Sequence, residues 1–288
     1  MGELLRLHDR PRLTDGRMVM ALDGWMDGGE ISTGTAEYLL RKLDAARIGE
    51  IDSEDFYILS FPGPMEVSAL FRPHTRIRDG SVVSLSSPQN VIYCSQAHNL
   101  VFLKGREPNL RWSRYLDEVL DLAVGLGVTL ICFVGSVAGM VPHTREPRYF
   151  ASISDPTLRP MLDRCGIKLS NYEGPASIIT QMILAAPQRD IRMMSLVAEI
   201  PAYVQGRNAR CIESAVRKVA GLLDLSVEFD DLRQAADELE KKLNDIVEGR
   251  EELATYIKKL EEDYDNQVFD TQMGDLKQWL EQQGIRLD

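Results

Sequence analysis

Val128-Thr129-Leu130-Ile131-Cys132-Phe133-Val134 runs directly into Gly135-Ser136-Val137-Ala138-Gly139 and then into Pro142-His143-Thr144-Arg145. A continuous apolar run of this length that ends in a glycine turn predicts a strand buried on both faces, with a functional loop at its carboxyl end. In an open α/β sheet, ligand-binding groups gather at that edge. This stretch therefore predicts the centre of the fold and the first place to look for a site.

The sequence on both sides repeats an order of strand, loop and helix. Helical spacing of apolar residues follows Trp112, Pro175 and Asn208, and also the glycine turn after residue 22. Such a succession predicts a parallel sheet with helices on both faces, which is the α/β class. The remaining strands are predicted at residues 18–22, 56–61, 91–94, 99–103 and 193–198.

Residues 62–90 show no clear period and are predicted to be irregular. They contain Pro73-His74-Thr75-Arg76, and the same four residues recur at 142–145. The flanking residues do not match, so the repeat does not indicate an internal duplication.

The chain changes character after residue 224. Apolar residues keep a three- and four-residue spacing from Leu232 to Leu260, interrupted at Gly249, which predicts a helical hairpin with a narrow apolar seam. From Asp224 to Asp288 there are 19 Asp and Glu against 8 Lys and Arg, so this part carries the whole net charge of −11. We expect an α/β core domain, 1–224, and an acidic helical extension, 225–288, whose seam packs on the core or on a neighbouring subunit.

The composition excludes several classes of function. An acidic chain without a basic stripe argues against binding to nucleic acid or to anionic lipid. No apolar run approaches the ~18 residues of a membrane span, and no signal sequence precedes the first strand, so we expect a cytoplasmic protein. The four histidines and four cysteines lack the spacing of a metal or redox motif, so we expect reduced structural thiols, no metal and no cofactor.

His143 and Arg145 are the first candidates for chemistry. A histidine beside a guanidinium on a loop at a strand end can bind a phosphate, a carboxylate or a carbonyl oxygen. Glu107 or Glu173 would then serve as a base, while backbone N–H groups near Gly135 would hold an anion. The alternative is structural, with Arg145 pairing with one of these glutamates and only holding loops together.

The loop with Gly24, Asp27 and Gly28 opens a helix and could aim N–H groups at a ligand, together with Gly135 and Ser136. It lacks both the dinucleotide pattern and the lysine of a phosphate-binding loop, so neither cofactor follows. Ser136 lacks the glycine two positions earlier that a nucleophile elbow requires. The alternative for this loop is a tight turn packed on the sheet.

Five short motifs in a fixed order resemble the proteasome assembly chaperone family, in particular its bacterial and archaeal single-chain members. The resemblance covers about residues 15–240. The motifs are Gly24-Trp25 with Asp27 and Gly29, Gly105-x-Glu107-Pro108 with Trp112, Gly135 with Pro142-His143-Thr144-Arg145, Tyr172-Glu173-Gly174-Pro175, and Pro201-x-Tyr203-Val204.

The resemblance implies a three-layer αβα fold with a mostly parallel sheet, similar to the nucleoside phosphorylase/hydrolase fold, in a homo-oligomer that is often a trimer. It implies a protein-binding scaffold or chaperone of undefined partner. The alternative is a hydrolase- or phosphorylase-like enzyme acting on a nucleoside, phosphate ester or amide. Relatives that bind the proteasome use a hydrophobic-Tyr-x tail, whereas this chain ends Ile285-Arg286-Leu287-Asp288, and Ala202 replaces a frequent histidine. We therefore expect no docking through that tail.

Overall fold

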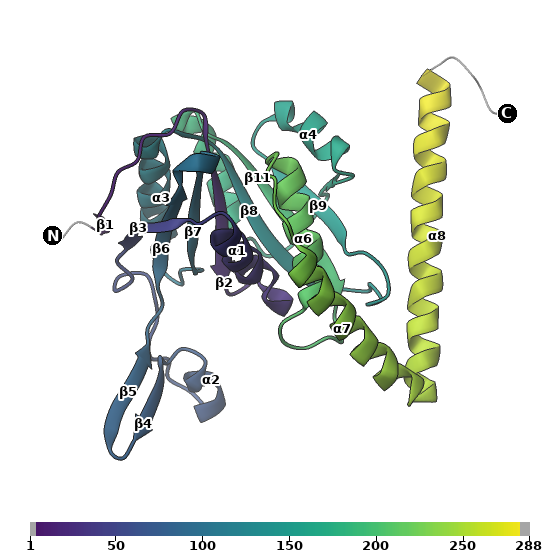
Figure 1. Ribbon diagram of the computed structural model, residues 1–288, viewed down its shortest axis with the longest axis horizontal. Coiled ribbons are helices and arrows are strands. Elements are labelled where there is room, and N and C mark those ends of the chain that lie inside the picture. The colour runs from purple at the N-terminus through teal and green to yellow at the C-terminus, as the bar shows by residue number, and fades with distance from the viewer. Residues whose placement is uncertain (1–3, 283–288) are drawn as a thin grey trace.

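The computed structural model describes residues 4–282, with side chains up to residue 269. The final Ile285–Asp288, on which the expectation about the docking tail rests, lie outside the described residues. A sheet of nine strands forms the centre of the molecule, in the order β1-β3-β6-β7-β2-β8-β11-β9-β10 (Figure 1). The strands are β1 (Leu5–Leu7), β2 (Gly16–Asp23), β3 (Ala46–Ile51), β6 (Asn90–Ser95), β7 (Leu100–Arg106), β8 (Val128–Gly139), β9 (Arg148–Ile153), β10 (Lys168–Leu169) and β11 (Arg192–Pro201).

Strand β8 lies in the parallel centre of this sheet, as its sequence predicts. It pairs in parallel with β2 on one side and β11 on the other, and β2 pairs in parallel with β7. Leu130 and Cys132 enter one core cluster while Ile131 and Phe133 enter the other, so both faces of β8 are buried. Of the remaining pairings, β7–β6, β6–β3, β3–β1 and β11–β9 are antiparallel, and β9–β10 is parallel. The expected parallel sheet is therefore the centre of a larger mixed one.

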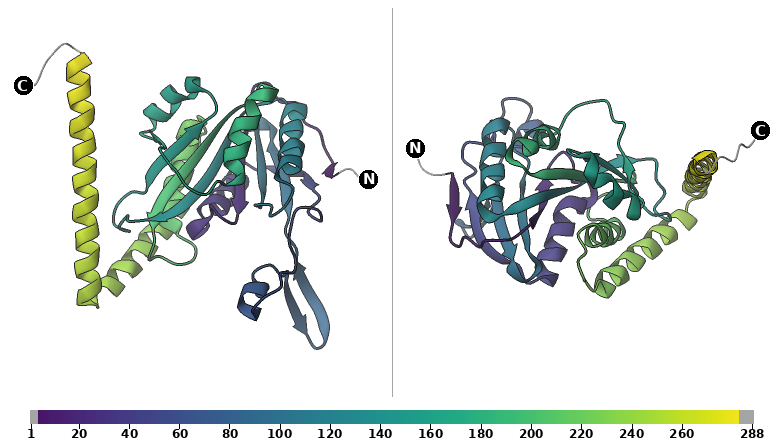
Figure 2. Two further views of the ribbon diagram at one scale, coloured as in Figure 1. Left: turned by 180° about the vertical axis from the view of Figure 1, so that it is seen from behind. Right: turned by 90° about the horizontal axis from the view of Figure 1, so that it is seen from above.

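Helices cover both faces of the sheet, which gives three layers (Figure 2). Apolar residues of α3 and α5 pack on one face, and those of α1, α4 and α6 pack on the other. This arrangement confirms an α/β fold with a helical layer on each side. The helices of the two layers are α1 (Ile31–Lys42), α3 (Trp112–Leu126), α4 (Arg159–Arg164), α5 (Ile178–Ala185) and α6 (Ala209–Leu222), with single 3-10 turns at Gly28–Glu30, Gln96–His98, Pro156–Leu158 and Ala186–Arg189.

The strand predicted at 56–61 is wrong. Phe56 and Tyr57 are buried, but they belong to an irregular segment and not to a strand. The strand of this region is β3, which was not predicted because its polar residues interrupt the apolar pattern. The Tyr57 hydroxyl donates to the Arg106 carbonyl (2.6 Å) and accepts from Asn90 Nδ2 (2.9 Å). These two aromatic residues are therefore apolar because they pack on the core, and not because they belong to the sheet.

Residues 59–86, called the arm below, form structure where an irregular segment is predicted. They hold α2 (Met65–Ala69) and a hairpin of β4 (His74–Arg78) and β5 (Ser81–Ser86), paired only with each other. The arm projects away from the body (Figure 1 and the left view of Figure 2). The Tyr57–Asn90 hydrogen bond joins the chain before the arm to the chain after it, so the two ends of the arm are held close together at the body.

The two helices predicted on either side of Gly249 are present, and they diverge from that junction (Figures 1 and 2). Helices α7 (Asp230–Glu248) and α8 (Glu251–Gln282) meet at Gly249. Leu232 and Ala236 of α7 are buried and the helix packs on α6, while Ile257 and Leu260 of α8 are buried as well. Among residues 4–282, no helix combines the length and the apolar character needed to cross a bilayer.

Candidate functional site

The loop after β2 is fastened to the end of β8 by Ser136. Its backbone N–H donates to the Met26 carbonyl (2.9 Å), and its hydroxyl donates to the Gly28 carbonyl (2.6 Å). A Cβ on Gly135 would lie 2.6 Å from the Phe133 ring, so this position has no room for a side chain. Gly28, Gly135 and Ser136 are thus brought together as predicted, but the serine hydroxyl is already engaged with the backbone.

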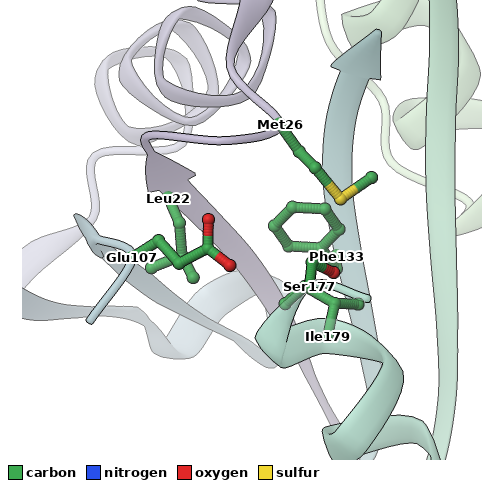
Figure 3. A pocket seen from close by; sticks show the side chains of 6 residues that line it. All are labelled: Leu22, Met26, Glu107, Phe133, Ser177 and Ile179. Carbon is green, nitrogen blue, oxygen red and sulfur yellow. The ribbon is translucent and has the colours of Figure 1, made fainter. Parts of the chain in front are cut away.

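Glu107 connects this loop to the start of α5. One carboxylate oxygen accepts from the Trp25 N–H (3.2 Å) and the other from the Ile178 N–H (3.2 Å) at the first residue of the helix. The positive end of a helix favours a carboxylate at this position. Figure 3 shows the Glu107 side chain among Leu22, Met26, Phe133, Ser177 and Ile179, which leave no cavity that a water molecule could enter. The carboxylate therefore fastens two segments in a closed space.

Asp27 fastens the other end of the same loop. Its carboxylate accepts from the Thr33 N–H (3.1 Å) and from the Thr33 hydroxyl (2.7 Å), in the first turn of α1. Burial raises the pKa of Asp27 to about 6, although the bonds from Thr33 oppose that shift. Asp23, four residues earlier, is exposed. Of these two aspartates, the fold half-buries Asp27 and leaves Asp23 at the surface.

His143 lies in a different place, under the C-terminal helices, and is 2% exposed. The Tyr203 hydroxyl accepts from the His143 backbone N–H (2.7 Å), so its own proton is directed to Nδ1 (2.7 Å). Burial raises the pKa of Tyr203 to about 12, which keeps that proton in place. Nε2 then carries hydrogen and donates to Asn244 Oδ1 of α7 (3.0 Å). Every polar atom of the ring has a partner.

Arg145 pairs with α8 and with neither of the glutamates considered above. Its Nε and Nη2 donate to the two oxygens of Asp265 (2.9 and 2.8 Å), while Nη1 lies 3.5 Å from Glu261. The Thr144 hydroxyl donates to Glu261, and the Tyr264 hydroxyl donates to the Glu146 carbonyl. The loop of residues 142–148 therefore holds α8 in place through these hydrogen bonds and ion pairs.

Glu173 lies apart from both groups, on the exposed segment that follows β10. Its neighbours Tyr172 and Pro175 border an open cleft of about 840 Å³ on the sheet face that also carries α5. Its lining includes Phe150 of β9, Val197 of β11, and the exposed Trp25 and Val137. We call this feature the cleft. Its lining is largely apolar, and no candidate acid or base from the sequence lines it.

The predicted site residues thus form two groups. Gly24, Asp27, Gly28, Glu107, Gly135 and Ser136 meet at one edge of the sheet, whereas His143 and Arg145 meet the C-terminal helices. Sequence reasoning missed Asn244 and Asp265 as their partners, and only Tyr203 stood in one of the motifs. Among the described side chains, no three His, Cys, Asp or Glu are grouped so as to hold a metal ion.

Solved structures of other proteins share this fold. A protein of unknown function from Mycobacterium tuberculosis, Rv2714, superposes with a TM-score of 0.83 at 21% identity, over 96% of this chain and 93% of that one. A PAC2 family protein from Streptomyces avermitilis gives 0.71, and a proteasome-assembly chaperone homologue from M. tuberculosis, Rv2125, gives 0.72. Each is 26% identical over 84% of this chain and 99% of its own.

No curated protein matches the sequence significantly. The sequence model of the PAC2 family matches residues 21–247, which is most of the chain. The sequence resemblance is therefore confirmed, and the chain belongs to the PAC2 family.

Proposed function

We propose that this chain is a homo-oligomeric scaffold of the proteasome-assembly-chaperone type, a trimer that works in the cytoplasm by binding a protein partner. Relatives described as a PAC2 family protein and as a proteasome-assembly chaperone homologue, both 26% identical over nearly their whole length, support a chaperone-type role. The partner class is protein, because neither charge nor composition favours nucleic acid or membrane.

One observation carries the proposal. Four of the candidate groups for chemistry, namely His143, Arg145, Glu107 and Ser136, are engaged in bonds within the chain, while Glu173 is exposed and lies apart from them. An acid, base or nucleophile must reach a substrate atom, and these groups hold loops and helices instead. Large exposed apolar surfaces accompany them, which indicates binding to protein.

The test is co-purification. The full chain, tagged and expressed in its own cells, should retain a protein partner in a fixed ratio, identified by mass spectrometry and reproduced with purified components. As a control variant, His74→Ala should retain the same protein partner, because this substitution leaves the described contacts unchanged. A chain that retains no protein above that found with an unrelated tagged protein would contradict the scaffold function.

The enzyme alternative has its own test. A thermal-shift panel of phosphates, nucleosides and nucleotides should leave the melting temperature unchanged if the chain is a scaffold. A shift that disappears in Asp27→Asn or Glu107→Gln variants that still fold would favour an enzyme at the loop behind β2.

A further inference from the structure

The arm carries an unusual concentration of exposed apolar side chains. Met65 is 83% exposed, Leu70 71% and Val82 66%. The remaining large apolar residues exposed on the arm are Leu59, Phe61, Val67, Ile77, Val83 and Leu85. A protein rarely leaves so many large apolar side chains of one segment exposed to water unless a partner covers them.

The register of the hairpin divides this patch into two faces. Ile77 stands opposite Val82, and Thr75 opposite Leu85, so these four share one face. The other face carries His74, Arg76 and Arg78, which form no ion pair within the described part of the chain. A two-stranded hairpin is marginal alone in water, so its apolar face requires a surface to pack against.

We infer that the apolar face of the arm packs into the cleft of a second copy of this chain. The inference rests on the homo-oligomer of the proposed function and identifies its interface. The cleft is the concave, largely apolar counterpart of the projecting arm. Sheet order separates the base of the arm, between β3 and β6, from the cleft on β9 and β11, and the arm projects away from its own body.

The exposed area fits a stable interface. At roughly 150–200 Å² for each fully exposed large apolar side chain, Ile77, Val82 and Leu85 of the hairpin face expose about 300 Å². The other exposed apolar residues of the arm, on α2 and beside it, bring the total toward the ~800 Å² that one partner contributes to a standard interface. Trp25, Val137 and Tyr172 line the cleft, are exposed, and offer matching apolar surface.

Arg76 and Arg78 lie on the other face of the hairpin, so the apolar face can enter the cleft without burying a guanidinium. Because two different surfaces meet, the contact is head-to-tail, and copies joined in this way close into a ring when the rotation allows it.

The first test is the mass of the full-length protein in solution, by light scattering during gel filtration. Met65→Glu and Val82→Glu should convert the oligomer into monomer at micromolar concentration, since each places a charge in an apolar contact. Val124→Glu is the matched control, because Val124 is an exposed valine on α3, outside the arm and the cleft. Unchanged circular dichroism would show that the variants fold.

The second test identifies the receiving surface. Samples of Val82→Cys and Val137→Cys, each in a Cys165→Ser background, are mixed under mild oxidation, since the other three native cysteines are buried. A disulfide-linked pair of the two differently tagged variants is expected, and none with Val124→Cys in place of Val82→Cys.

An oligomer that survives both arm substitutions, or arm variants that cross-link only with themselves, would overturn the inference while leaving the proposed scaffold intact. A monomeric wild-type protein would overturn both the inference and the oligomeric part of the proposed function.

Discussion

The same four residues, Pro-His-Thr-Arg, occupy two opposite environments in this molecule. At 142–145 the histidine is buried between Tyr203 and Asn244, and the arginine holds Asp265 with two hydrogen bonds. At 73–76 the histidine is exposed on the arm, and the arginine has no acidic partner among the described residues. A short motif therefore does not define a role, because the elements packed against it decide what its side chains do.

The largest expected effect separates the two histidines. His143→Ala removes the contacts of the buried ring with the Tyr203 hydroxyl and the Asn244 amide and leaves a cavity in its place, so the free energy of unfolding should fall by about 3 kcal/mol. His74→Ala should change it by less than about 0.5 kcal/mol, as an exposed position predicts. Urea titration at one fixed protein concentration measures both.

Similar losses for the two variants would contradict the contrast. They would mean that a contact between two copies of the chain buries His74. The effect of His74→Ala, measured again in a Val82→Glu background that lacks this contact, should then become small.

The central strands could be predicted from the sequence because burial on both faces leaves its mark in consecutive residues. Leu130 to Val134 is apolar without interruption, with Val128 one residue before it, and β8 is found there. The arm could not be predicted in this way, since its hairpin is exposed on both sides and includes a bulge between Arg76 and Ile77. β3 was missed for a related reason, as Arg47, Gly49 and Glu50 interrupt its alternation.

The candidate site was harder to predict than the fold, for a reason of distance along the chain. Asn244 lies 101 residues after His143, and Asp265 lies 120 residues after Arg145. Spacing within a motif carries no information on such contacts. The sequence identified side chains able to do chemistry, but their role follows from partners that only the fold brings near.

The second prediction extends the comparison to the two aspartates of the first loop. Burial raises the pKa of Asp27 to about 6, so the stability that this group contributes is full below about pH 4 and is lost as the pH rises through 6. The loss amounts to at most about 3 kcal/mol, given ~1.4 kcal/mol for each pKa unit. Asn can still accept from the Thr33 N–H but cannot ionise.

Asp27→Asn should therefore raise the melting temperature at pH 8 and change it little at pH 4. Asp23→Asn is the matched control, because its carboxylate is exposed and its replacement relieves no burial. Scanning calorimetry from pH 4 to pH 8 measures the difference. A wild-type protein that gains stability relative to Asp27→Asn as the pH rises would show that the ionised carboxylate is favoured in its place.

The smallest expected effect separates the two arginines. Arg145 fits both oxygens of Asp265, and Glu261 lies nearby, so the pair holds α8 on the loop of residues 142–148 without forming part of the core. Arg145→Ala should raise amide hydrogen exchange in residues 256–268 a few-fold, and Arg145→Lys should recover only part of the protection, because an ammonium cannot reproduce the fork. Arg76→Ala should leave exchange in α8 unchanged.

Since the Arg145–Asp265 pair is partly exposed, 1 M salt should bring exchange in the wild-type protein toward that of Arg145→Ala. If neither Arg145→Ala nor salt changed amide exchange in α8, the buried Ile257 and Leu260 alone would hold the helix. In the motif at 142–145, only His143 would then stabilise the structure.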